Sequence, residues 1–202
     1  NVMEIAKKFN VKHLLMASTS SVYGSNLKMP FTETEKTDTQ LTIYSSTKKA
    51  NESMAHSYSY LWKIPTTMFR FFTVYGPCGR PDMALFKFVS SILNNKPIDI
   101  YNNGEMYRDF TYIDDLVYGI KLLVDVIPSD SNNIISSDSL SPIAPYRVVN
   151  IGNSNKISLI DFIEAIEDIL GKKAIRNYMP MQKGDVRATW SDTNLLKNLT
   201  NY

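Results

Sequence analysis

The sequence predicts an α/β protein with a doubly wound parallel sheet and a smaller C-terminal lobe. In the first part of the chain, apolar and β-branched runs alternate with segments of helical periodicity, which is typical of strand–helix–strand units. Polar loops follow two of the predicted strands, at the position where parallel sheets carry their reactive groups. The second part has shorter strands and more loop. We therefore expect residues 1–80 to belong to the sheet domain and residues 81–202 mainly to the lobe, with some elements returning to the sheet.

The first part of the chain is expected to contain two helices and two strands. Strands are predicted over residues 11–18 and 66–72, and a helix over residues 44–61. A loop is predicted over residues 73–83. The chain opens with the end of an amphipathic helix, whose apolar face is expected to contain Val2, Ile5, Ala6 and Phe9.

The next segments are predicted to be short. A helix is expected over residues 84–95, and a strand over residues 98–101 that ends at an Asn-Asn-Gly turn. Another strand is expected over residues 110–113. Asp114 has the residue type of a helix cap and is expected to begin a helix that runs to residue 127.

The last segments begin with a long polar loop over residues 128–145 and a strand over residues 147–151. Ser158 is expected to cap a helix with an apolar stripe, and Gly171 to end it. Residues 195–202 are expected to begin a final helix.

The composition excludes several classes of protein. The 202 residues carry a net charge of +2, which is too small to indicate nucleic acid or a membrane surface as a partner. No apolar stretch approaches the length of a membrane span. A single cysteine, Cys78, excludes a disulfide framework and fits a reducing, cytoplasmic compartment. His13 and His56 have no Cys/His cluster around them, so no metal site is expected.

The residues that are expected to carry chemistry are Thr19, Tyr44 and Lys48. Tyr44 and Lys48 are four residues apart, so a helix places them on one face. An ammonium beside a phenol favours the phenolate and lowers the tyrosine pKa from its usual value of about 10. The hydroxyl of Thr19 is suited to hold a substrate hydroxyl against that phenolate. The triplet therefore predicts proton transfer to and from an alcohol while a hydride leaves the carbon beneath it.

Five motifs follow one another along the chain. They are Ser18-Thr19-Ser20-Ser21-Val22-Tyr23-Gly24, Tyr44-x-x-x-Lys48, Arg70-Phe71-Phe72-Thr73-Val74-Tyr75-Gly76-Pro77, Arg108-Asp109-Phe110-Thr111-Tyr112-Ile113-Asp114-Asp115 and Gly184-Asp185-Val186. In this order they resemble the extended short-chain dehydrogenase/reductase family, the NAD-dependent nucleotide-sugar epimerases and dehydratases. The resemblance covers nearly the whole chain.

This resemblance implies a Rossmann-like sheet, of which the chain holds a part, and NAD as the cofactor. Tyr44 is then the base that takes the proton of the C4 hydroxyl and later returns it. Lys48 keeps Tyr44 ionised and binds the nicotinamide ribose, and Thr19 positions the C4 oxygen. The resemblance also implies cofactor contacts from Ala17, Ser18, Phe71 and Phe72.

The residues after Thr19 indicate the type of reaction. In the family's 4,6-dehydratases an Asp-Glu pair follows the catalytic threonine, whereas Ser20 and Ser21 stand there in this chain. Elimination of water is therefore disfavoured and 4-epimerisation is favoured. Because galactose-type enzymes usually have Asn where Thr73 stands, the chain is most similar to UDP-glucuronate 4-epimerases. The hydroxyls of Thr19, Ser20 and Thr73, together with Arg80, are expected to bind the sugar carboxylate.

The nucleotide half of the substrate has its own predicted contacts. Arg108 is expected to clamp the diphosphate, because a guanidinium matches phosphate oxygens with two hydrogen bonds. Asp185 is expected to accept hydrogen bonds from the uridine ribose. Two alternatives stay open at this point: an epimerase for another UDP-sugar, such as galactose or an N-acetylhexosamine, and a non-catalytic sugar-nucleotide binding protein.

A glycine-rich pyrophosphate turn is absent from the sequence, which contains no Gly-x-x-Gly-x-x-Gly or Gly-x-Gly-x-x-Gly. Such a turn presents backbone N–H groups to the dinucleotide, and in the family it lies upstream of the segment that begins at Asn1. We expect the chain to be a fragment that lacks this turn and a C-terminal tail, and to be inactive alone. The resemblance also implies a homodimer formed through helices that include the one bearing Tyr44.

Overall fold

The computed structural model describes residues 1–129 and 138–202, and it confirms the α/β class. Its central sheet has three parallel strands in the order β1-β2-β7. These strands are β1 (Leu14–Ala17), β2 (Thr66–Phe71) and β7 (Tyr146–Ile151). Because the strands run in the same direction, their carboxyl ends lie at the same edge of the sheet.

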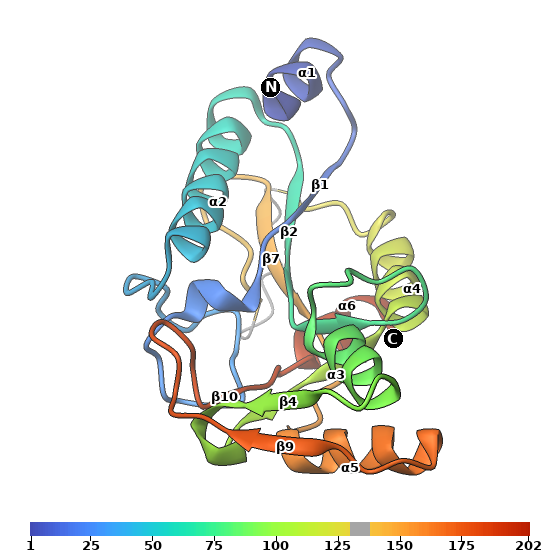
Figure 1. Cartoon of the computed structure of the whole chain (residues 1–202). Coiled ribbons are helices and arrows are strands. Elements are labelled where there is room, and N and C mark those ends of the chain that lie inside the picture. The colour runs from blue at the N-terminus through green and yellow to red at the C-terminus, as the bar shows by residue number, and fades with distance from the viewer. Residues whose placement is uncertain (130–137) are drawn as a thin grey trace.

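Helices cover both faces of this sheet (Figure 1). They are α1 (Val2–Lys8) and α2 (Ile43–Trp62) on one face, and α4 (Ile113–Leu123) and α6 (Asn194–Thr200) on the other. Successive strand residues point to opposite faces. Met68 therefore packs with Ala55 of α2, whereas its neighbour Phe69 packs with Leu116 and Leu123 of α4.

A lobe lies beyond the carboxyl end of the sheet, in the lower part of Figure 1. Its elements are α3 (Ala84–Leu93), β4 (Pro97–Ile100), α5 (Leu159–Leu170) and β9 (Ile175–Tyr178). β4 and β9 pair in parallel. Apolar side chains of α3, β4 and α5, among them Ile92, Ile98 and Ile163, form the core of the lobe.

Short elements connect the sheet to the lobe. They are the 3₁₀ helices η1 (Ser20–Tyr23) and η2 (Tyr101–Gly104), and the strands β3 (Thr73–Tyr75), β5 (Tyr107–Arg108), β6 (Phe110–Tyr112), β8 (Ile157–Ser158) and β10 (Ala188–Thr189). β3 pairs with β6, and β5 lies between β10 and β8. β3, which leads from the sheet into the lobe, is thus hydrogen-bonded to β6, which leads into α4 on the sheet.

The fully buried carboxylate of Asp109 fixes this junction. Its Oδ1 accepts from the backbone N–H of Asn153 at 2.8 Å, and its Oδ2 accepts from the N–H groups of Ser154 and Ser191, both at 3.0 Å. The hydroxyl of Ser191 donates to the same Oδ2 at 2.6 Å. Four donors replace the water that the charge loses on burial, so β6, the turn after β7 and the segment after β10 are held together at one point.

Several helix ends follow the predictions. Ser158 accepts a hydrogen bond from the N–H of Asp161 at 3.0 Å and caps α5. The same helix ends at Gly171, whose φ of 60° is a left-handed conformation that suits glycine. At the start of α2, Thr42 and Ser45 form a reciprocal capping box that the sequence analysis did not predict.

Other predictions about local structure were wrong. On α1 the residues that face the protein are Met3 and Ala6, whereas Val2, Ile5 and Phe9 are exposed. Asp114 lies inside the first turn of α4 and makes no side-chain cap; the N-cap is Tyr112. The predicted loop 73–83 begins with strand β3. Residues 130–137 of the predicted loop 128–145 lie outside the described residues.

Candidate functional site

A cavity of about 520 Å³ lies where the carboxyl end of the sheet meets the lobe. The loop after β1, the start of α2, the segment after β2 and the strand β5 contribute to its walls. Most of the predicted site residues line it, namely Thr19, Ser20, Tyr44, Phe72, Thr73, Arg80, Arg108 and Asp185. The fold thus gathers side chains that are widely separated in the sequence.

Four predicted site residues are not among those that line the cavity: Ala17, Ser18, Lys48 and Phe71. The carbonyl of Ala17 accepts a hydrogen bond from Lys48, and the buried hydroxyl of Ser18 donates to Glu52. Phe71 packs on the opposite face of the sheet, against the cluster that contains Phe69. Since neighbouring strand residues point to opposite faces, Phe72 lines the cavity and Phe71 does not.

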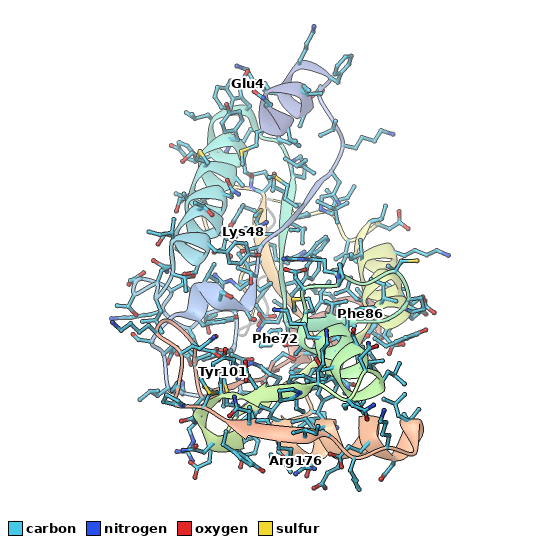
Figure 2. The ribbon with its side chains drawn as sticks, viewed as in Figure 1. Glu4, Lys48, Phe72, Phe86, Tyr101 and Arg176 are labelled. Atoms are coloured by element: carbon cyan, nitrogen blue, oxygen red, sulfur yellow. The ribbon has the colours of Figure 1, made fainter. Side chains whose placement is uncertain are left out.

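Tyr44 and Lys48 lie in the first two turns of α2. Tyr44 is half exposed at the cavity wall. Lys48 points from α2 toward β1 (Figure 2), and its Nζ donates to the carbonyl of Ala17 at 3.2 Å. The same Nζ lies 6.0 Å from the ring centroid of Tyr44. The ammonium is therefore held between the end of the strand and the phenol ring.

Thr19, on the loop after β1, lines the same cavity as Tyr44. Its side chain is nearly buried, and its Oγ1 accepts from the N–H of Ser21 at 3.2 Å, which caps η1. The Thr19 hydroxyl also donates to the Oγ of Ser21 at 3.2 Å. Ser21 is therefore a cavity residue that orients Thr19, although the sequence prediction did not include it in the site.

Aromatic residues form another part of the cavity wall. The rings of Tyr23 and Phe31 stack at 4.3 Å between centroids, and Phe72 packs against them. The Tyr23 hydroxyl donates to Oδ1 of Asn150 at 2.7 Å. Burial raises the pKa of Tyr23 to about 12, so it stays protonated and serves as a structural donor. Sequence analysis missed Phe31, because it lies in an irregular loop with no periodic pattern.

Arg80 lies on the exposed loop between β3 and α3. Its guanidinium forms a two-pronged ion pair with Asp82, with Nε to Oδ1 at 3.0 Å and Nη2 to Oδ2 at 2.5 Å. The side chains of both residues are mostly exposed, so this ion pair is weak. The guanidinium of Arg80 can therefore leave Asp82 for another anion at little cost in free energy.

Arg108 and Asp185 meet on the lobe side of the cavity. Nη2 of Arg108 donates to Oδ1 of Asp185 at 2.7 Å, and Nη1 donates to the carbonyl of Tyr107 at 2.8 Å. Both charged residues also line a smaller cavity of about 230 Å³ inside the lobe. Its walls are mainly apolar and aromatic, with Asp99 and Tyr101 at the side of η2. Sequence analysis predicted neither of these two residues.

Glu33 is a buried carboxyl behind the aromatic wall. Its Oε1 accepts from the N–H of Asn150 at 2.8 Å, and its backbone carbonyl accepts from Nη1 of Arg70 at 3.2 Å. Burial raises the pKa of Glu33 to about 7, and the charge of Asp192 adds to this while that of Arg70 opposes it. Glu33 therefore titrates near neutral pH.

Two further observations bear on the class of site. Within residues 1–129 and 138–202, no three His, Cys, Asp or Glu side chains are grouped in a way that would hold a metal ion. Among the described helices, none is both long and apolar enough to cross a membrane.

Comparison with known proteins gives the family. The model of the NAD dependent epimerase/dehydratase family matches residues 1–136. The chain belongs to this family. It is 54% identical over its whole length to a protein named "Probable UDP-glucuronate 4-epimerase" from Rhizobium meliloti (strain 1021), and it covers 60% of that protein.

Two further relatives agree with this. A UDP-glucuronate 4-epimerase from Thermodesulfobacterium geofontis (strain OPF15) is 41% identical over the whole chain, which covers 57% of it. A crystal structure of UDP-glucuronic acid 4-epimerase from Bacillus cereus, in complex with UDP-glucuronic acid and NAD, superposes with a TM-score of 0.85 at 33% identity. The chain is covered completely and spans 59% of that structure.

The first testable prediction concerns Glu33. Its pKa in the folded protein is about 7, above the usual value of 4.5, so the folded state binds more protons than the unfolded chain between these values. Stability therefore falls as pH rises from 4.5 to 7. We expect Glu33→Gln, which mimics the protonated form, to be more stable than the wild type at pH 8 by about 2–3 kcal/mol, with a smaller difference at pH 5.

Urea unfolding at both pH values measures this difference. Glu35→Gln is the matched control in the same loop, because a hydrogen bond from Lys28 lowers the pKa of Glu35; it should give no gain at pH 8. Equal stability of the Glu33→Gln variant and the wild type at pH 8 would show that Glu33 is not forced to ionise inside the protein.

Proposed function

We propose that the full-length protein is an NAD-dependent nucleotide-sugar 4-epimerase that interconverts UDP-glucuronate and UDP-galacturonate. The observation that carries this proposal is the arrangement of Thr19 and Tyr44 on the walls of one cavity, with the ammonium of Lys48 held 6.0 Å from the Tyr44 ring. The family and the named relatives support it. The chain spans about 60% of the length of the first of these relatives, so the activity is proposed for the full-length protein.

The residues of this chain provide the proton transfer. Tyr44 accepts the proton of the C4 hydroxyl and later returns it, while the charge of Lys48 favours the phenolate. Thr19, oriented by Ser21, donates to or accepts from the C4 oxygen. When bound, NAD supplies the acceptor and donor of the hydride at C4. A 4-keto sugar would then turn over within the cavity and present its opposite face, and Tyr44 would return the proton to the C4 oxygen.

The residues present fit the nicotinamide half of NAD. Lys48 and the carbonyl of Ala17 lie at the carboxyl end of β1, where parallel sheets bind nucleotides. Phe72, which lines the cavity, offers an apolar surface on the α2 side of the sheet. Ala17, Ser18 and Lys48 would hold the ribose and the nicotinamide.

We assign the substrate carboxylate to hydrogen-bond donors in the cavity wall. Thr19, Ser20 and Thr73 contribute hydroxyl groups, and Arg80 contributes a cation that exchanges Asp82 for the ligand. Neither Ser20 nor its neighbour Ser21 can serve as a carboxylate base, so water elimination has no base at these positions.

The nucleotide is assigned to the lobe. Arg108 binds the diphosphate and Asp185 binds the uridine ribose, and the smaller apolar cavity beside them receives the base.

The single, exposed Cys78 fits a reducing compartment, so we place the protein in the cytoplasm.

The central prediction is loss of catalysis in Tyr44→Phe. Removing the phenolic oxygen should lower kcat for UDP-glucuronate by about 100-fold or more, while the KM changes little because the ring is retained. Conversion to UDP-galacturonate by the full-length protein with NAD, followed by chromatography, measures this. Tyr60→Phe, an exposed tyrosine on the same helix, is the control and should retain full activity. Retained turnover in the Tyr44→Phe variant would remove the proposed base.

The choice of substrate is tested at Thr73. Thr73→Asn should raise the KM for UDP-glucuronate about tenfold, because a hydrogen bond to a carboxylate contributes about 1.5–3 kcal/mol. Thr73→Ser retains the hydroxyl and should stay within about twofold of the wild type. If Thr73→Asn uses UDP-glucuronate unchanged, or if the wild type prefers UDP-galactose, the carboxylate assignment is wrong and the alternative UDP-sugar is favoured.

We also propose a homodimer formed by α1 and α2. On α2, Ala50, Met54 and Leu61 are exposed and lie opposite the buried side of the helix. On α1, Val2, Ile5 and Phe9 are exposed as well. The two helices are held together, since the Tyr58 hydroxyl donates to Glu4 and Nζ of Lys7 lies 4.1 Å from the Trp62 ring centroid. A second copy of the same face would bury both stripes.

Charged substitutions at the exposed apolar residues of α2 test the dimer. The double variant Met54→Glu/Leu61→Glu should be monomeric, because each dimer would bury four uncompensated carboxylates. Light scattering coupled to size-exclusion chromatography measures the mass. Val117→Glu, on the exposed face of α4, should leave the dimer intact. A dimeric Met54→Glu/Leu61→Glu variant would exclude this interface.

A further inference from the structure

A buried ion pair lies directly behind the cavity. Nε of Arg70 donates to Oε1 of Glu52 at 2.9 Å, and Nη2 donates to Oε2 at 2.9 Å. The side chains are only 4% and 3% exposed. The Arg70 guanidinium also lies 4.8 Å from the ring centroid of Tyr23, so one face of the pair is in contact with the cavity wall.

Glu52 also takes a third donor, from the loop that carries Thr19. The hydroxyl of Ser18 donates to Oε1 of Glu52 at 2.6 Å, and the N–H of Ser18 donates to the carbonyl of Phe69 at 2.6 Å. Ser18 immediately precedes Thr19, so a shift of Ser18 is transmitted to the Thr19 hydroxyl. One carboxylate thus connects α2, which carries Tyr44, to the end of β1 and the end of β2.

The position of Glu52 on α2 also bears on the charge of Lys48. Tyr44, Lys48 and Glu52 are spaced by four residues, so they share one face of the helix. Lys and Glu at this spacing usually attract each other. Yet no described carboxylate lies within ion-pairing distance of Lys48, whose Nζ donates to the carbonyl of Ala17. Both oxygens of Glu52 are occupied by Arg70.

We propose, on the basis of the epimerase function above, that Glu52 and Arg70 are positioning residues for the proton-transfer triplet. Glu52 fixes Thr19 through Ser18. Arg70 holds both oxygens of Glu52 and thereby keeps this carboxylate away from Lys48, so that the full charge of Lys48 acts on Tyr44. Neither residue touches the substrate.

The first test isolates the connection to Thr19. Ser18→Ala removes the hydroxyl but leaves the ion pair of Glu52 with Arg70 in place. We expect kcat to fall about tenfold in the full-length protein at saturating NAD, while the KM for UDP-glucuronate stays within about twofold. Lys49→Ala is the matched control, because Lys49 contacts Glu52 only at 3.6 Å and is partly exposed; its kcat should not change. Unchanged kcat in Ser18→Ala would overturn this part of the proposal.

The second test isolates the protection of Lys48. Lys49 already lies 3.6 Å from Oε2 of Glu52, so the variants of this test all carry Lys49→Ala as a common background. In Arg70→Met the freed Glu52 then pairs with Lys48, so the acidic limb of the kcat–pH profile should move upward by about one pH unit. In Arg70→Met/Glu52→Met the competing carboxylate is gone, and the limb should return to its wild-type position although kcat stays low. The apolar pair has a similar volume, and such replacements of buried ion pairs usually fold. If Arg70→Met does not fold, Arg70→Gln replaces it, since a neutral amide keeps a polar group at the site but has no charge to hold Glu52.

A substrate-free readout separates this proposal from the proposed function. The ionisation of Tyr44 is followed as the ultraviolet absorbance change that Tyr44→Phe abolishes. Its midpoint should rise in Arg70→Met and return in the double variant, whether or not UDP-glucuronate is turned over. The same midpoint in the single and double variants would overturn the protection of Lys48. If the midpoints are as expected but the wild-type protein does not turn over UDP-glucuronate, only the proposed function is overturned.

Discussion

The buried ion pair between Arg70 and Glu52 is the constraint on which the cavity depends. Removing two charges from water is costly, and the cost is offset only when geometry and additional hydrogen bonds are favourable. Here the two-pronged contact, the Ser18 hydroxyl and the carbonyl of Glu33 satisfy the pair. These partners come from four segments that meet only in the folded protein. The pair therefore joins these four segments at one point, although buried pairs of this kind often add little net stability.

Strand alternation determines which side chains reach this pair. Arg70 lies on the same face of β2 as Met68, toward α2, whereas Phe69 and Phe71 lie toward α4. Phe72 then returns to the side of the cavity. A one-residue shift in the register of β2 would exchange the buried arginine for a phenylalanine. The six-residue register with β7, from Thr66–Tyr146 to Phe71–Ile151, prevents such a shift.

The sequence was sufficient for the long elements and for eight of the twenty residues that line the cavity. Local patterns located α2, α5 and β2, Ser158 and Gly171 located the ends of α5, and the spacing of Tyr44 and Lys48 placed both on one helix face. Strands such as β5, β8 and β10, each of two residues, were missed because distant backbone pairing creates them. Of the predicted face of α1 only Ala6 is buried, because Met3 packs with Ala55 and Met68, and no local pattern contains that contact.

The junction at Asp109 explains how sheet and lobe residues share one cavity. The backbone N–H of Thr73 donates to the carbonyl of Asp109 at 3.0 Å, while the Asp109 carboxylate holds the turn after β7 and the segment after β10. Arg108, its neighbour, faces the cavity and pairs with Asp185. Thr73 and Arg108 are thus separated by a single backbone hydrogen bond and one peptide unit. Because the distance between their backbones is fixed by buried contacts, the fold sets the span between the two groups that we propose bind the sugar and the diphosphate.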